Sequence, residues 1–145
     1  MEKQDIYITV YRLINKYNAK TKQPKTFGTT HTFCGSEAQV MDVLAHEENV
    51  TASQIANILG ITKGAVSQTL AKLQKKDLIV RESAGDNNTA FIHLSKAGEE
   101  ILVNYYAYRD CRLRKLKAAA LSLPPESAAT VMDMLEAFEE ALDYY

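Results

Sequence analysis

Two helical segments joined by a three-residue turn, Gly60 to Thr62, constrain the fold of this chain more than any other feature. Thr51 and Gln54 have capping-box spacing, and the apolar stripe that follows them ends at Gly60. Thr62 can cap the next segment, which runs to about Lys76. Because so short a turn holds two helices at a steep angle, the sequence predicts a helix-turn-helix unit.

The second helix of this unit has one apolar side and one small or polar side. Val66, Leu70 and Leu73 recur at positions i, i+4 and i+7, which predicts that they face the core. In a helix-turn-helix unit the second helix enters the major groove of DNA, and its first turns meet base edges. The outward-facing candidates for DNA contact are Lys63, Gly64, Ser67, Gln68 and Lys72.

These side chains suit particular contacts. The amide of Gln68 can form two hydrogen bonds with adenine, and Lys63 can reach guanine or a phosphate. Gly64 and Ser67 are small enough for the helix to approach the groove closely. The backbone amides at the start of the first helix can bind a phosphate. The candidates near the starts of the two helices are Thr51, Ser53 and Thr62.

The segments around this unit predict further elements. Two β-compatible runs flank a stretch rich in Gly, Asp and Asn, which is typical of a hairpin tip. The expected strands are Leu78–Glu82 and Ala90–Leu94. The expected helices cover about Asp5–Asn18, Ser36–Glu47 (with a capping box at Ser36 and Gln39), Ser95–Ala120 and a last segment from Pro125.

The predicted fold class is therefore mainly α with a small β-hairpin wing, a winged helix-turn-helix with N- and C-terminal dimerisation helices. We expect one structural domain in three parts. Residues 1–35 form the N-terminal dimerisation helix and loop, residues 36–98 form the DNA-binding lobe, and residues 99–145 form the C-terminal dimerisation helices.

A homodimer is predicted from apolar side chains that a small winged-helix core cannot cover. Burying them in a two-fold dimer sets two recognition helices about one DNA turn apart. The alternative is that they pack within one chain. These side chains are Leu102, Tyr105, Val131, Leu135 and Phe138.

Composition limits the class of protein. With 145 residues, of which 46% are hydrophobic and 24% charged, the chain can form a packed core. Its net charge is −1, but residues 51–81 carry five bases and one acid, whereas residues 126–145 carry six acids and no base. We find neither a signal peptide nor a membrane-spanning run, so we expect a cytoplasmic protein without a membrane partner.

The stretch Ser36–Gly98 resembles the MarR family of bacterial transcription regulators. The run TKGAVSQTLAKLQKKDL, Thr62 to Leu78, is similar to that family's recognition helix, and LSKAG, Leu94 to Gly98, resembles its motif after the wing. The resemblance implies a DNA-binding transcription regulator that binds double-stranded DNA as a dimer. A repressor on a pseudo-palindromic operator is the form that it favours.

Carried over by position, the resemblance implies base contacts from Lys63, Gly64, Ser67 and Gln68 and a phosphate contact from Lys72. It also places the wing tip, including Asn87 and Asn88, near the minor groove. Asn88 stands where the family usually has a minor-groove arginine, so the contribution of the wing is open. Asp77 stands where a glycine often ends the recognition helix, and Asp tolerates the left-handed conformation that this position requires.

The resemblance also implies that a signal regulates DNA binding, commonly a small phenolic or lipophilic effector. A ligand pocket between the dimer helices and the DNA-binding lobe is the leading expectation, and no cofactor is expected. The same aromatic residues can instead be core or dimer contacts. The candidate lining residues are Tyr11, Phe33, Tyr105 and Tyr108.

Cys34 is an alternative sensor. It lies just before a predicted helix N-terminus, where a thiolate can be stabilised, so a redox-responsive regulator is one alternative. His31, Cys34 and Glu37 are spaced by three and could join Cys111 around a metal, although we assign no metal site.

Other classes of function are also constrained. The three histidines are scattered, and no phosphate-binding glycine loop is present, so we expect no enzymatic activity. A winged helix that binds protein is the stronger alternative, because the last helix is acidic and the wing lacks its arginine.

Overall fold

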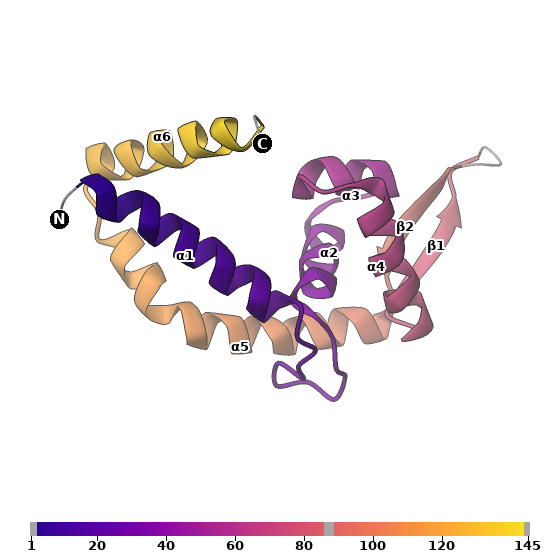
Figure 1. Cartoon of the computed structure of the whole chain (residues 1–145). Coiled ribbons are helices and arrows are strands. Elements are labelled where there is room, and N and C mark those ends of the chain that lie inside the picture. Colours follow the sequence, from indigo (N-terminus) through magenta and orange to yellow (C-terminus); the bar gives the residue numbers. More distant parts are fainter. Residues whose placement is uncertain (1–2, 86–88, 144–145) are drawn as a thin grey trace. The chain divides into compact units, whose positions relative to one another are not determined.

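The structure is a computed structural model that describes residues 3–85 and 89–143. In these ranges, four helices precede one β-hairpin and two helices follow it (Figure 1). The chain forms two units, Met1–Tyr108 and Arg109–Tyr145, and their boundary falls within the long helix α5 (Lys96–Leu121). The mainly helical winged fold predicted from the sequence is confirmed. The elements are α1 (Lys3–Thr21), α2 (Gly35–His46), α3 (Ala52–Leu59), α4 (Lys63–Lys75), β1 (Ile79–Ser83), β2 (Ala90–Leu94), α5 (Lys96–Leu121) and α6 (Pro125–Leu142).

The core of the first unit lies between α2, α3, α4, the hairpin and the start of α5. The predicted stripe of α4, Val66, Leu70 and Leu73, is completely buried there. Burial of each such side chain contributes roughly 1.5–3 kcal/mol, so the inner side of α4 is held firmly. Leu102 is also buried in this core, which corrects the prediction that it needs a partner chain. The other buried members include Phe33, Val40, Met41, Ile55, Leu78 and Ile92.

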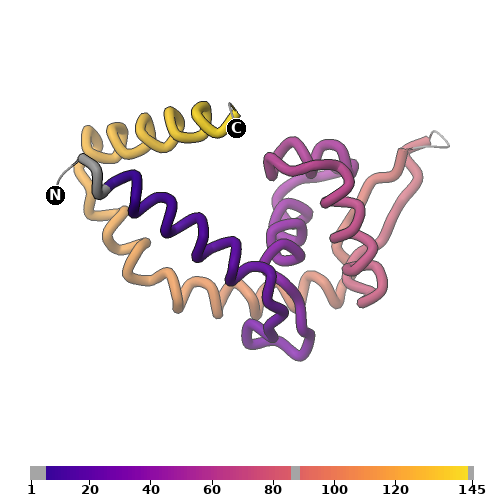
Figure 2. Tube along the Cα trace, in the orientation of Figure 1, coloured from indigo at the N-terminus to yellow at the C-terminus, as the bar shows by residue number. Residues whose placement is uncertain are grey.

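The turn between α3 and α4 has the predicted chemistry. The Oγ1 of Thr51 accepts a hydrogen bond from the Gln54 amide at 3.3 Å, and the Oε1 of Gln54 accepts one from the Thr51 amide at 2.9 Å. Gly60 ends α3 with a positive φ of 63°, and Thr62 caps α4. The two helices therefore run in clearly different directions (Figure 2).

The start of α2 differs from the prediction. Ser36 and Gln39 are not its capping box, because α2 begins at Gly35 with Cys34 as its N-cap. The Cys34 amide donates to Oε2 of Glu37 at 2.7 Å, so Glu37 takes the role expected of Gln39. The other carboxylate oxygen of Glu37, Oε1, lies 2.6 Å from Nζ of Lys76. This contact holds the Glu37 side chain in place and favours Cys34, and not Ser36, as the N-cap of α2.

The hairpin pairs antiparallel from Ile79 with Leu94 to Ser83 with Ala90. Its inner strand also receives one bridge from outside, since the Ile92 amide donates to the Val50 carbonyl at 2.9 Å. This bridge ties the wing to the segment before α3. The wing residues Asn87 and Asn88 lie outside the described residues.

A close backbone approach joins the end of α4 to the start of α5. Asp77 adopts the left-handed conformation with φ 56°, as expected from its position. The Oγ of Ser95 donates to the Asp77 carbonyl at 2.6 Å and accepts from the Gly98 amide at 3.1 Å. A Cβ on Gly98 would lie 2.2 Å from the Leu78 carbonyl oxygen, so only glycine fits without a shift. This contact gives the LSKAG motif a packing role.

The remaining helices expose apolar side chains. On α1, Tyr7 and Ile8 are about two-thirds exposed, and Tyr17 reaches α2 through a hydrogen bond with Gln39. Within the second unit, α6 has no buried residue, and Val131 and Leu135 are 40% and 50% exposed. Within the described ranges 3–85 and 89–143, no helix combines the length and hydropathy needed to cross a bilayer.

Candidate nucleic-acid interface

The outer side of α4 is polar, small and exposed. Lys63, Gly64, Ser67, Gln68 and Lys72 are all exposed, as the sequence predicted. The hydroxyl of the cap residue Thr62 accepts from the Ala65 amide at 3.2 Å, which fixes the first turn of the helix. A helix that contacts base edges needs a fixed first turn with exposed polar side chains, and the start of α4 has both.

The sequence interpretation left out two exposed residues that continue this surface. Ala71 and Lys75 are exposed, and they follow Gly64 and Gln68 along the helix at intervals of three or four residues. The helical period alone was therefore sufficient to include them. On the hairpin, Arg81 is an exposed cation at the position paired with Ile92.

The lysines of α4 fall into two groups. Lys63, Lys72 and Lys75 form no ion pair with residues 3–85 or 89–143, so their charges remain available. Lys76 instead binds within the chain. Its Nζ lies 2.6 Å from Oε1 of Glu37 and donates to the Thr32 carbonyl at 2.8 Å.

At the start of α3 the candidates differ in availability. The hydroxyl of Thr51 is engaged with Gln54 in the capping box, and Ser53 lies half-buried in the first turn. A helix leaves four amides at its start without a partner in the helical ladder, and the capping box of α3 uses those of Thr51 and Gln54. The anion-binding capacity of this end therefore resides in the backbone more than in the Thr51 side chain.

Three of the four aromatic candidates for a ligand pocket come together. Phe27, which the sequence interpretation missed, joins them with ring centroids 5.0 Å from Phe33, 5.3 Å from Tyr105 and 5.7 Å from Tyr108. Phe33 is completely buried, whereas Tyr11 lies on α1 and is 49% exposed. Phe33 and Tyr105 also contact each other, with ring centroids 5.8 Å apart, and Tyr108 contacts Phe27. The role of these rings in ligand binding stays a prediction.

Cys34 and its neighbours are engaged in local contacts. The Sγ of Cys34 lies 3.5 Å from the Lys22 carbonyl. Both carboxylate oxygens of Glu37 are occupied, one by the Cys34 amide and one by Lys76. Cys111 belongs to the second unit and is exposed. Among the residues that the structure describes, no three His, Cys, Asp or Glu side chains are grouped to hold a metal ion.

Residues 28–87, which include the whole helix-turn-helix unit and β1, match the family model described as MarR family. No curated protein sequence matches the chain.

Several solved structures share the fold over nearly the whole chain. ZitR of Lactococcus lactis in complex with DNA is 17% identical, with a TM-score of 0.72, covering 98% of this chain and 99% of that one. FabT of Streptococcus pneumoniae in complex with DNA is 22% identical, with a TM-score of 0.70 and 98% of both chains covered. A MarR/EmrR family transcriptional regulator from Acinetobacter sp. ADP1 is 21% identical, with a TM-score of 0.70, covering 98% of this chain and 97% of that one.

These matches agree with the interpretation made from the recognition-helix run and the LSKAG motif. They also agree with the prediction that the chain is not an enzyme, because the matched family is one of transcription regulators. Residues 28–87 thus match the model of the MarR family, and the chain has the winged helix-turn-helix fold of the structures solved for that family.

Proposed function

We propose that this protein is a cytoplasmic transcription regulator that binds double-stranded DNA as a homodimer, with α4 as the recognition helix. The observation that carries this proposal is the division of α4 into a completely buried side and an exposed polar side whose lysines are unpaired within the described ranges. ZitR and FabT, which share the fold, have been solved with DNA.

In the proposed complex, Lys63, Gly64, Ser67 and Gln68 meet base edges and Lys72 binds a phosphate. Each is exposed on the first three turns of α4. Gln68 can make a bidentate pair with adenine, which gives sequence selectivity, whereas Lys72 binds any sequence equally. The amides at the start of α3, near Thr51 and Ser53, bind a further phosphate.

The homodimer is supported by the exposed apolar residues of α1 and α6. A helix such as α6, with Val131 and Leu135 exposed and no residue buried in its own chain, is stabilised when a second chain covers it. A two-fold dimer places its two recognition helices about 34 Å apart on a pseudo-palindromic operator. Repression, with release by a small-molecule effector, is the mode of regulation that we propose.

Fluorescence anisotropy tests the proposal. The probes are DNA from upstream of the protein's own gene and a scrambled sequence of the same composition, with oligomeric state followed by light scattering. We expect selective binding of one dimer per site and a loss of affinity of at least tenfold between about 50 and 200 mM salt. Salt-insensitive or absent DNA binding would favour the alternative, a protein-binding winged helix.

Two variants separate the proposed roles on α4. Gln68→Ala should reduce discrimination between the two DNAs by about 1–3 kcal/mol, because a bidentate base contact is lost. Lys72→Ala should weaken binding to both DNAs and lower the salt slope by about one per protomer. The matched controls are Gln74→Ala, an exposed amide near the end of α4, and Lys20→Ala at the end of α1, and neither should have these effects. If Gln68→Ala and Lys72→Ala change the affinity for the two DNAs by the same factors, the assigned roles are wrong.

A further inference from the structure

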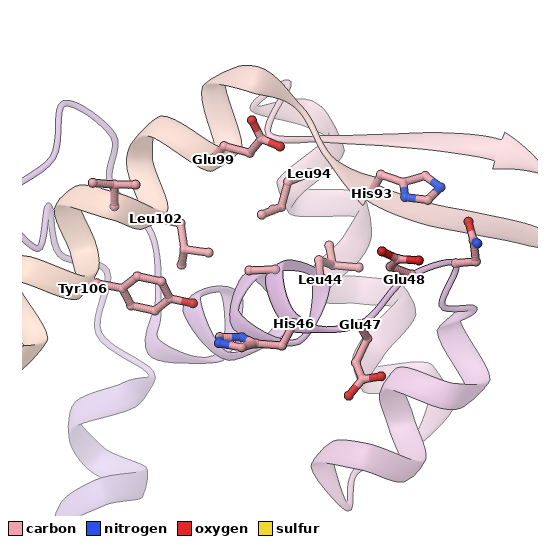
Figure 3. A pocket seen from close by; sticks show the side chains of 12 residues that line it. Leu44, His46, Glu47, Glu48, His93, Leu94, Glu99, Leu102 and Tyr106 are labelled. Atoms are coloured by element: carbon pink, nitrogen blue, oxygen red, sulfur yellow. The ribbon is translucent and has the colours of Figure 1, made fainter.

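An open pocket of about 600 Å³ lies in the first unit, and no residue of α4 lines it (Figure 3). Its walls come from the end of α2, the segment that follows α2, the end of β2 and the first half of α5. A volume of this size accommodates a drug-sized molecule. None of the four aromatic residues expected from the sequence to line a ligand pocket lines this one.

The middle of the pocket is apolar. Figure 3 shows the side chains of Leu44, Leu94 and Leu102 directed toward it. Leu44 and Leu102 are buried members of the core, so this floor is fixed by the packing of the fold. Val103 lies at the exposed rim. A ligand that fits here therefore needs an apolar body.

The charges around this apolar floor are all of one sign. Glu47, Glu48 and Glu99 line the pocket, and among the described residues no lysine or arginine does. Figure 3 places Glu48 and His93 at one end of the pocket and shows Glu47 directed away from its middle. The formal charges of these glutamates give the pocket a negative field. Such a field attracts cations and repels anions.

The opposite end of the pocket strengthens this preference. Tyr106 and His46 lie there (Figure 3), and the Tyr106 hydroxyl donates a hydrogen bond to Oδ1 of Asp42. Nδ1 of His46 is 2.8 Å from the Asp42 carbonyl. The Asp42 carboxylate thus lies at the hydroxyl end of the Tyr106 ring, and the face of an aromatic ring attracts organic cations.

We infer that this pocket binds an organic monocation with an apolar body, an arylalkylamine in chemical class, in preference to a carboxylate or a phenolate of the same shape. The apolar body lies on the leucine floor, and the ammonium group lies at the rim, attracted by the charges of Glu48 and Glu99, which line different walls. The role of this pocket as an effector site rests on the proposed function. An effector site here is consistent with the fold, because two elements that line the pocket contact the proposed DNA-binding elements. Of these, α2 packs against α4, and β2 pairs with β1.

Isothermal titration calorimetry of the full chain without DNA tests the inference. The probes are phenylbutylamine, phenylbutanol and phenylbutanoate, which share one apolar body and differ in charge. We expect affinity to fall in that order. An ion pair at an exposed position contributes about 1.4- to fivefold in affinity, so the double variant Glu48→Gln/Glu99→Gln should weaken amine binding by about two- to thirtyfold.

Two further variants make the test specific. Glu100→Gln is the matched control, since Glu100 is exposed beside Glu99 but does not line the pocket, and amine affinity should not change. Val103→Lys adds a cation at the rim and should weaken amine binding while improving phenylbutanoate binding.

The inference is overturned if phenylbutanoate binds as tightly as the amine. It is equally overturned if the double variant leaves amine affinity unchanged, or if the amine fails to bind at millimolar concentration. Because this titration contains no DNA, its failure bears on the pocket alone. Failure of the anisotropy experiment bears on the proposed DNA-binding function alone.

Discussion

Replacement of Lys76 by methionine should destabilise this protein without changing its contacts with phosphate. The Lys76 ammonium lies 2.6 Å from Oε1 of Glu37, whose side chain is only 3% exposed. Methionine keeps the apolar part of the lysine stem but removes the charge. Glu37 then remains a nearly buried carboxylate, and among residues 3–85 and 89–143 its one remaining donor is the Cys34 amide.

The magnitude follows from the burial of the two partners. Removing one partner of a fully buried ion pair costs about 3–5 kcal/mol. The Lys76 side chain is 30% exposed, so water can reach part of the vacated space and we expect a loss of about 2–3 kcal/mol. The control is Lys75→Met, at an exposed lysine without an ion pair in the described residues, which should change stability by less than about 0.5 kcal/mol.

Urea unfolding followed by circular dichroism, at one fixed protomer concentration, measures both variants. A double-mutant cycle with Lys76→Met, Glu37→Gln and the variant that carries both substitutions measures the interaction free energy between the two side chains. We expect it to be at least about 1 kcal/mol. In anisotropy, Lys76→Met should retain the wild-type salt slope, because Lys76 contacts Glu37 and not phosphate. A loss for Lys76→Met no larger than that for Lys75→Met would refute this reasoning.

Three further predictions follow from other local contacts. Gly98→Ala should destabilise the protein by about 1–3 kcal/mol in thermal unfolding, because its Cβ would meet the Leu78 carbonyl at 2.2 Å. Gly64→Ala, in an open helical position, should instead stabilise it by up to about 1 kcal/mol yet weaken operator binding, and a rise in affinity would contradict close approach at Gly64. The hydrogen bond from Lys117 holds the pKa of Asp110 below its ordinary value, so its small stabilisation is present above the ordinary pKa and lost as pH falls through the lowered one. An NMR titration should show Lys117→Gln moving the Asp110 midpoint upward, and an unmoved midpoint would contradict the assigned cause.

Much of the recognition unit was predictable because its determinants are local. The caps at Thr51 and Thr62 join residues three positions apart, and Gly60 ends α3 through its own backbone conformation. The stripe of α4 repeats with the helical period, and Asp77 adopts the expected left-handed conformation. These features require no knowledge of distant parts of the chain.

The register of α2 and the availability of each lysine depend on contacts that join distant segments. Glu37 and Lys76 are 39 positions apart, and their contact both holds the cap of α2 and removes Lys76 from the exposed cations of α4. Ser36 and Gln39 have acceptable capping chemistry, and the local sequence gives no reason to prefer Cys34 and Glu37. The pairing between helices makes that choice.

The sequence by itself determined the order of the elements and the buried and exposed sides of α4, because patterns with periods of two to four residues encode them. It also showed the resemblance to the MarR family, through the runs Thr62–Leu78 and Leu94–Gly98. Only the tertiary structure placed Leu102 in the core, brought Phe27 to the aromatic cluster and built the acidic pocket beside β2. Burial and electric field at a site depend on side chains that converge from separate segments, and the spacing of residues along the chain does not specify which of them meet.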